Sequence, residues 1–176
     1  MSQAIDNLLV LARHARFDDP DGARRDLVEA VALARKAEDP LQLAKTLTAL
    51  GQIERDLHRM DEALRHYEEV ADIYRSVDIP LKFAHAVRHA GDIHQDEGHL
   101  QLAEPCYVEA LTIYRAHPET PPLDLANTLR GLALLKEAIG EPKESVALWQ
   151  EARNLYASVN VEAGVQESER RLKHLG

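Results

Sequence analysis

The segments GQIERDLHRMDEALRHYEEVADIYR (residues 51–75) and GDIHQDEGHLQLAEPCYVEALTIYR (residues 91–115) are two copies of one pattern, displaced by 40 residues. Small, aliphatic and aromatic residues recur at fixed places in both copies. The matched pairs are Gly51/Gly91, Ile53/Ile93, Asp56/Asp96, Ala63/Ala103, Tyr67/Tyr107, Ile73/Ile113 and Tyr74/Tyr114. Self-similarity at a fixed period of this length indicates a repeat protein in which each unit packs against its neighbours.

Further copies lie on both sides of this pair. A third begins 42 residues after the second and places Trp149 opposite Tyr107 and Tyr156 opposite Tyr114. A divergent first copy is visible where residues 31–44 match residues 71–84, as expected for a terminal repeat with one uncovered face. We therefore expect a single domain over residues 1–176, with repeats at about 4–40, 41–80, 81–122 and 123–160 and a capping helix at 161–174.

Within each copy, apolar residues recur every three or four positions, which is the spacing of an amphipathic helix. The breaks contain Asp-Pro pairs, glycines and a proline-rich segment over residues 118–122, all of which end or begin helices. Each repeat is therefore predicted to be two antiparallel helices, and the fold class all-α. The predicted helices are 3–16, 21–37, 41–57, 60–77, 81–97, 100–117, 123–139, 142–158 and 161–174. Pro105 falls inside one of them, where it either kinks the helix or delays its start.

Composition limits the classes of partner. The formal net charge is -9 and the isoelectric point is near 5.4, whereas phosphate backbones and anionic membranes attract surfaces rich in lysine and arginine. We therefore expect no nucleic acid and no membrane partner. No segment reads as a signal peptide or a transmembrane helix, and a single cysteine cannot form an internal disulfide, so the expected location is cytoplasmic.

The positions of the small and aromatic residues resemble the tetratricopeptide repeat. They read Leu47, Leu50, Gly51, Ala63, Tyr67 and Val70 in one copy, then Val87, Ala90, Gly91, Ala103, Tyr107 and Ala110, then Leu129, Leu132, Ala133, Ser145, Trp149 and Ala152. The period of 40 to 42 exceeds the usual 34 or so, which is similar to the longer repeats of kinesin light chains. The resemblance implies a right-handed α-solenoid of four antiparallel helical hairpins with a C-terminal capping helix.

The stretch GDIHQDEGH (residues 91–99) raises the question of a metal site. Residues two apart on a helix face different ways, so this cluster divides. His85, His89, Asp92 and Asp96 do share one stripe, and two imidazoles with a carboxylate could hold a transition metal. The same stripe in the preceding copy reads Lys45, Ala49, Gln52 and Asp56, which favours a solvated or ligand-facing surface. We expect no metal and no cofactor.

Motifs of catalysis are absent from the sequence. It contains no glycine-rich phosphate loop, no GxSxG and no HExxH, and Cys106 has no evident basic neighbour to lower its pKa. The tyrosines and Trp149 stand at repeat-equivalent positions, so core packing accounts for them. We expect a protein that is not an enzyme.

The tetratricopeptide resemblance places one face of each first helix on the concave side of the solenoid. The residues predicted to line a peptide-binding groove there are Lys45, Thr48, Gln52, Arg55, His85, Arg88, Asp92, Asn127 and Arg130. Basic and acidic side chains at opposite edges suit an extended peptide, with Arg88 and Arg130 gripping a carboxylate. Alternation of charge that merely keeps this face soluble is the competing explanation.

The sequence thus favours a non-catalytic adaptor that binds a peptide or protein segment. Two other functions stay open. A self-associating structural module would form a homodimer through Ile5, Leu8 and Leu9 at the edge of the first hairpin. A sensor of a small ligand or metal would use His85 and His89.

Overall fold

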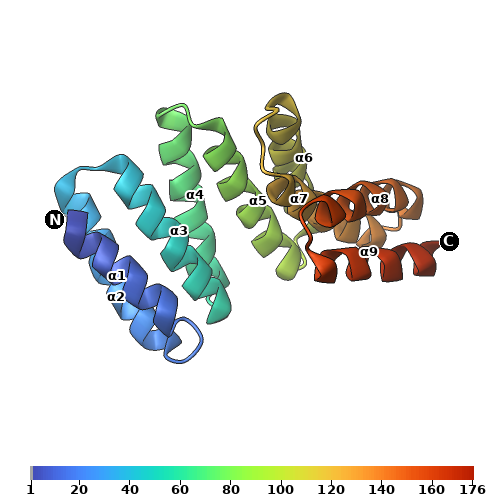
Figure 1. Cartoon of the computed structure of the whole chain (residues 1–176). Coiled ribbons are helices and arrows are strands. Elements are labelled where there is room, and N and C mark those ends of the chain that lie inside the picture. The colour runs from blue at the N-terminus through green and yellow to red at the C-terminus, as the bar shows by residue number, and fades with distance from the viewer. Residues whose placement is uncertain (1) are drawn as a thin grey trace. The chain divides into compact units, whose positions relative to one another are not determined.

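The computed structural model describes residues 2–176, and every regular element in that range is an α-helix (Figure 1). Each helix begins and ends within one residue of its predicted bounds. The helices over residues 2–176 are α1 (Ser2–Ala15), α2 (Pro20–Ala37), α3 (Pro40–Asp56), α4 (Met60–Ser76), α5 (Pro80–Asp96), α6 (Leu100–Ala116), α7 (Pro122–Ala138), α8 (Pro142–Ser158) and α9 (Glu162–Leu175). None of them combines the length and apolar character required to cross a bilayer.

The chain divides into two compact units, residues 1–89 and residues 90–176, with the boundary inside α5. In the first unit, α1 packs on α2 and α3 packs on α4 as antiparallel pairs, and α2 also packs on α3 (Figure 1). In the second unit, α7 pairs with α8, α6 packs on α7, and α9 covers α8. Each unit therefore has its own core of hairpins.

Proline fixes where helices begin. The helices α2, α3, α5, α7 and α8 all have proline as their first residue, where no backbone donor is needed. Before two of these prolines, an aspartate accepts a backbone N–H two residues beyond the proline: Asp19 from Gly22 (2.9 Å) and Asp39 from Gln42 (3.0 Å). The Asp-Pro pairs predicted to be breaks are N-terminal caps.

The turns after the helices share one geometry. A residue with positive φ follows α3, α4, α5, α7 and α8, namely His58, Asp78, Gly98, Gly140 and Asn160. The next residue then donates its N–H to a carbonyl five positions back, as in Arg59 to Glu54 (2.7 Å) and His99 to His94 (2.7 Å). This is the bonding pattern of the Schellman motif. A short turn of fixed geometry therefore ends helices throughout the array.

The turn after α6 departs from that geometry and explains the change of period. Pro118 occupies the place of Asp78, and its ring fixes φ at a negative value, so the left-handed turn cannot form. The chain instead leaves α6 in extended backbone at His117, and the Thr120 hydroxyl donates to the Tyr114 carbonyl (2.9 Å). The connection grows from three residues to five, and the period from 40 to 42.

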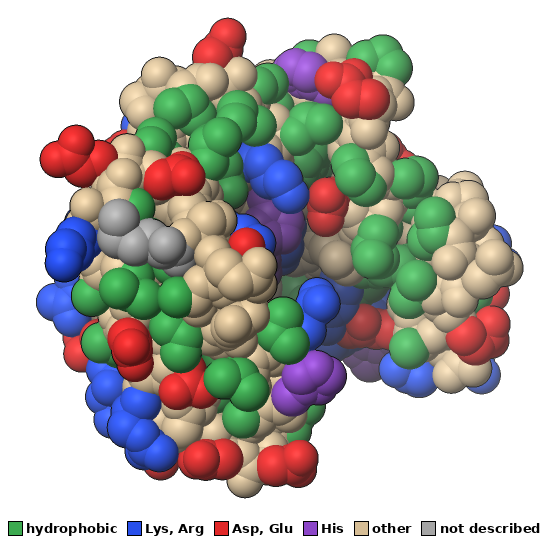
Figure 2. Space-filling model, turned by 60° about the vertical axis from the view of Figure 1, so that its left-hand side comes forward, with side chains coloured by type: hydrophobic (Ala, Val, Ile, Leu, Met, Phe, Trp, Pro, Cys, Tyr) green, Lys and Arg blue, Asp and Glu red, His purple; other side chains and the backbone are tan. Residues whose placement is uncertain are grey.

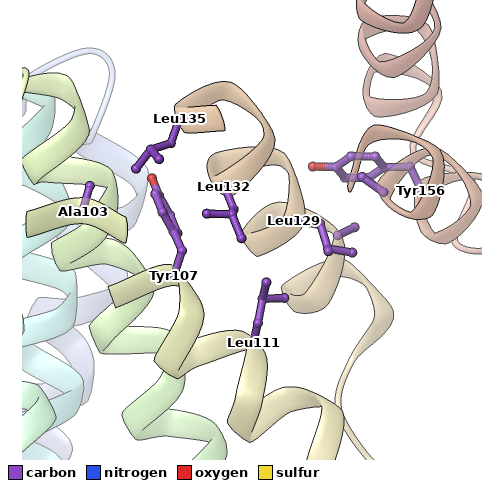
Figure 3. Close-up of a cluster of buried hydrophobic side chains, with 9 residues drawn as sticks. Ala103, Tyr107, Leu111, Leu129, Leu132, Leu135 and Tyr156 are labelled. Carbon is purple, nitrogen blue, oxygen red and sulfur yellow. The ribbon is translucent and has the colours of Figure 1, made fainter. Parts of the chain in front are cut away.

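Small residues opposite aromatic rings set the distance between helices. Tyr107 is 1% exposed and fits between Gly91 on α5 and Gly131 on α7. A Cβ at Gly131 would lie 2.5 Å from the Tyr107 ring, and one at Gly164 would lie equally close to Tyr156. Figure 3 shows Tyr107 directed towards the leucines of α7. The glycines permit helix contacts that any larger residue would prevent.

The third repeat accommodates its departures from the pattern by a hydrogen bond. Ser145 replaces the alanine found at Ala63 and Ala103, and all three side chains are fully buried. The Ser145 hydroxyl donates to the carbonyl of Ala133 across the hairpin (3.0 Å). A buried hydroxyl with a partner costs little, so the substitution is compatible with the packing.

Pro105 lies within α6, which begins five residues earlier. A delayed helix start, one of the two alternatives derived from the sequence, is therefore wrong. The helix continues through the proline without its hydrogen bond to the carbonyl four residues back.

Removing or adding strain at the turns should change stability in opposite directions. We expect His58→Gly to raise the free energy of unfolding by about 1 kcal/mol, because glycine relieves the left-handed backbone strain at φ 57°. Gly98→Ala should lower it by about 1 kcal/mol, since an alanine Cβ there touches nothing and only the backbone is strained. Urea unfolding followed by circular dichroism measures both, and changes of the same sign would contradict this account.

The glycine opposite Tyr107 should be the more sensitive packing position. We expect Gly131→Ala to destabilise the protein by about 1 to 3 kcal/mol, because the ring is buried and bonded through its hydroxyl to Asp92 (2.9 Å) and cannot move aside. Gly51→Ala is the matched control, since its Cβ would lie 3.1 Å from the Tyr67 ring. An equal loss in the two variants, in the same urea titration, would show that close packing at Gly131 is not the cause.

Candidate functional site

The first unit contains a cavity of about 530 Å³ between the first helices of its repeats. Its walls come mainly from α1, α3 and the start of α5. The lining residues are Asp6, Leu9, Val10, Ala12, Arg13, Arg16, Leu27, Lys45, Thr48, Ala49, Gln52, Ile53, Tyr67, His85 and His89. A volume in this range suits several side chains of a bound segment or one small ligand.

The structure brings four of the predicted groove residues to this cavity: Lys45, Thr48, Gln52 and His85. Arg55 and Arg88 belong to the same unit but are not among its lining residues. Asp92, Asn127 and Arg130 lie in the second unit. Peptide binding by these residues stays a prediction.

Most of the predicted groove side chains have partners inside the chain. In the first unit, Lys45 Nζ lies 3.0 Å from Asp6 Oδ1, Gln52 donates to Asp56 (3.1 Å), and the Thr48 hydroxyl donates to its own helix. A ligand that uses these groups has to compete with existing interactions. The sequence reading could not include this competition because the partners of Lys45 and of other ion pairs are almost one repeat away.

The second unit has the same character. Asn127 accepts the Tyr156 hydroxyl (2.8 Å), and Asp92 accepts that of Tyr107. Arg130 donates through Nε and Nη2 to both oxygens of Glu167 on α9, at 2.6 and 2.8 Å. The hydrogen bonds of this fork raise the pKa of Arg130 and lower that of Glu167. Arg130 therefore already holds a carboxylate.

Two histidines form the α5 wall of the cavity. The His85 and His89 rings meet edge to face, 4.6 Å apart, and His89 stacks on Tyr67 with ring centroids 4.7 Å apart. Burial lowers the pKa of His85 to about 4, with further contributions from the positive charges of Arg88 and Lys82. Burial likewise places the pKa of His89 well below its ordinary value. Both rings are neutral at pH 7.

Sequence reasoning missed the contribution of α1, above all Arg13. Its side chain is exposed, lines the cavity and makes no hydrogen bond or ion pair with any residue from 2 to 176. The signal was present, because Asp6, Leu9, Arg13 and Arg16 recur at helical spacing along one stripe. The first hairpin was aligned through its second helix only, so α1 received no place on the predicted concave face.

The predicted edge for self-association is wrong in its residues. Ile5 is 1% exposed and packs with Ala30 and Ala34, and Leu8 and Leu9 are partly buried against this cluster. The exposed apolar side chains near α1 are instead Val10, Leu11 and Phe17, at 54%, 56% and 83% exposure. Figure 2 shows hydrophobic side chains of this kind interspersed with charged ones on the visible face.

Other reactive groups do not assemble into a centre. Among residues 2–176, no three histidine, cysteine, aspartate or glutamate side chains are arranged to hold a metal ion. The Cys106 sulfur lies 3.4 Å from the Leu102 carbonyl oxygen of its own helix, and its Cβ faces the backbone at Gly91. The cysteine therefore belongs to the contact between α5 and α6.

The depressed pKa of His85 predicts loss of stability in acid. Unfolded histidine binds a proton near pH 6.5 and folded His85 only near pH 4, so the unfolded chain holds the extra proton between these values. The free energy of unfolding should fall as the pH drops through this window, and His85→Gln should reduce the fall by on the order of 1 to 3 kcal/mol. Urea titrations at neutral and acid pH measure this, with exposed His14→Gln as control. Equal pH dependence in the wild type and both variants would contradict the assignment.

Comparisons with known proteins agree with this architecture. Two tetratricopeptide repeat models match residues 4–76 and residues 89–117, which together are more than half of the chain. No curated protein sequence matches it. The family and the fold are therefore identified by the repeat itself.

Solved structures of the same fold include proteins from several sources. BtubC (BKLC) from P. vanneervenii is 21% identical with a TM-score of 0.77, over 89% of this chain and 64% of that one. The TPR-like repeats of a Podosopora anserina protein described as a kinesin light chain are 17% identical, with a TM-score of 0.70 over 97% and 94% of the two chains. RapI in its apo form is 12% identical, with a TM-score of 0.84 over 94% of this chain and 60% of RapI.

The chain thus spans less than two thirds of BtubC and of RapI. These similarities confirm the predicted all-α solenoid of helical hairpins, including the likeness to kinesin light chain repeats. With the matches of the repeat models and the hairpins described above, they lead to one conclusion. The chain belongs to the tetratricopeptide repeat family.

Proposed function

We propose that the chain is a non-catalytic interaction module that binds an extended segment of a partner protein in the cavity of its first unit. Tetratricopeptide repeats mediate protein–protein interactions, and this chain has two matches to that family. The observation that carries the proposal is the cavity itself, which is formed by the first helices of successive repeats.

The charges around the cavity favour an acidic segment with apolar side chains. The protein has a net charge of -9, yet the cavity is lined by Arg13, Arg16 and Lys45 against the single carboxylate of Asp6. A local excess of positive charge on an acidic protein attracts anionic ligands and repels cationic ones. The apolar part of the lining, such as Leu9 and Ile53, gives aliphatic side chains of the segment a surface to cover.

Arg13 is the residue best placed to bind the first carboxylate. Arg16 is held by Asp56 through two hydrogen bonds (2.6 and 3.1 Å), and Lys45 is held by Asp6. A ligand gains a charge-assisted bond from Arg13 without first breaking one. At Lys45 it would have to exchange one carboxylate for another.

The remaining predicted residues enter this proposal as secondary contacts. Arg130 can bind a ligand carboxylate only by releasing Glu167, and Asn127 only by sharing its bond to Tyr156. Arg88 and Arg130 therefore rank behind Arg13 as anchors. A cytoplasmic location and the absence of nucleic acid and membrane partners complete the proposed role.

The charge of Arg13 should decide affinity for an acidic peptide. We expect a short fluorescein-labelled peptide of leucine, serine and glutamate to bind, and the version with lysine in place of every glutamate to bind far more weakly. Arg13→Glu should weaken binding of the acidic peptide about tenfold or more, because a charge-assisted bond becomes a repulsion. Fluorescence anisotropy measures the dissociation constants.

Arg25→Glu is the matched control, since it makes the same charge change on exposed α2 at a residue that does not line the cavity. Equal weakening in the two variants would reduce the effect to the overall charge. Absence of binding to either peptide would count against an acidic segment as ligand. Sedimentation at several concentrations is run alongside, because Val10, Leu11 and Phe17 could also pair two copies of the chain.

A further inference from the structure

The histidine wall of the cavity has a hydrogen bond that fixes its protonation state. Arg88 Nη2 lies 2.7 Å from His89 Nε2, and a guanidinium carries donors only. The His89 nitrogen must therefore be the acceptor, with its lone pair free of a proton. This conclusion follows from the geometry of the contact.

A proton on His89 Nε2 would convert this bond into a repulsion between two cations. The neighbouring ring of His85 is 4.6 Å away, so charge on either imidazole also opposes charge on the other. The empty cavity is thus arranged for two neutral rings. Burial of both rings, which lowers the pKa of each, acts in the same direction.

We infer that binding of an acidic segment in this cavity is coupled to uptake of a proton by the His85–His89 pair, so that acidification favours the loaded form. The inference rests on the proposed function and adds a regulatory property to the same site. It requires the ligand to supply negative charge that the cavity itself lacks.

The groups that surround the pair show that this charge is missing. Those on α1 and its following turn are Asp6, Arg13 and Arg16; those on α3 are Lys45 and Arg55; Tyr67 comes from α4; and α5 itself adds Lys82, Arg88 and, one turn beyond His89, Asp92. Among the lining residues the only carboxylate is Asp6, which Lys45 already neutralises (3.0 Å). A ligand carboxylate would change this balance and stabilise an imidazolium.

Binding and protonation must then favour each other. Any ligand that raises the pKa of a group must bind more tightly when that group is protonated, because the two equilibria share one cycle. Between the depressed pKa of the empty site and the higher pKa of the loaded site, affinity should rise by up to about tenfold for each unit of pH decrease per proton taken up. The direction is opposite to that expected from protonation of the ligand's own carboxylates.

Isothermal titration calorimetry with the leucine, serine and glutamate peptide tests the coupling directly. Titrations at about pH 6, where glutamate is ionised, are run in MES and in imidazole buffers, which differ in ionisation enthalpy. We expect the apparent enthalpy to change with buffer in the sense of proton uptake, and the affinity to increase several-fold between neutral pH and pH 6. His85→Gln combined with His89→Gln should remove the buffer dependence, and His14→Gln should retain it.

The outcomes separate this inference from the function on which it rests. Tight binding with no buffer dependence, or with proton release, would overturn the coupling and leave peptide binding intact. No binding in any buffer would overturn both. Should the double variant fail to fold, NMR titration of the wild-type histidines with and without peptide decides the point: two low midpoints must rise when peptide is added, and unchanged midpoints would refute the coupling.

Discussion

The fit of an aromatic ring against a helix that has glycine at the point of contact is the constraint on which the rest of the structure depends. Tyr107 reaches from α6 to Gly91 on one side and Gly131 on the other, and Tyr156 fills the equivalent space against Gly164. Rings buried to this extent contribute large apolar areas, and their depth is set by the absence of a side chain opposite. Because the ring and the glycine come from successive helices, one contact fixes both the hairpin and its junction with the next. The same spacing that buries the rings also aligns the first helices of neighbouring repeats, and the cavity of the first unit lies between such helices.

Local chemistry determined much of this architecture, so the sequence was a good guide to it. Helix ends coincide with Asp-Pro pairs and with residues able to adopt positive φ, and these signals require no knowledge of distant contacts. The lengthened third period shows what the sequence contained but did not explain. Pro118 cannot adopt the left-handed conformation that Asp78 and Asn160 use, and the two additional residues of the connection follow from that restriction.

The candidate site was less predictable because its state depends on partners almost one repeat away in the chain. Asp6 with Lys45, Arg16 with Asp56, and Arg130 with Glu167 each join first helices of neighbouring repeats, and each uses a side chain that a single-helix pattern presents as available. Such exposed pairs add little stability but fix which groups stay open to a ligand. Arg13 was overlooked for a related reason, since its helix belongs to the divergent first copy. Periodicity could assign faces to helices, but only packing shows which charges on those faces are already neutralised.

The uniform helix length has a consequence for how this array can change in evolution. Six consecutive helices, α3 to α8, each contain 17 residues, and short connections of fixed geometry join most of them. A duplication or deletion of one whole 40-residue block therefore rejoins identical junctions and keeps every aromatic ring opposite a small residue. An insertion of a few residues inside a helix would rotate all later side chains away from their partners. Arrays of this kind should accordingly gain and lose length in complete modules, and their binding surfaces should lengthen or shorten by the same increments.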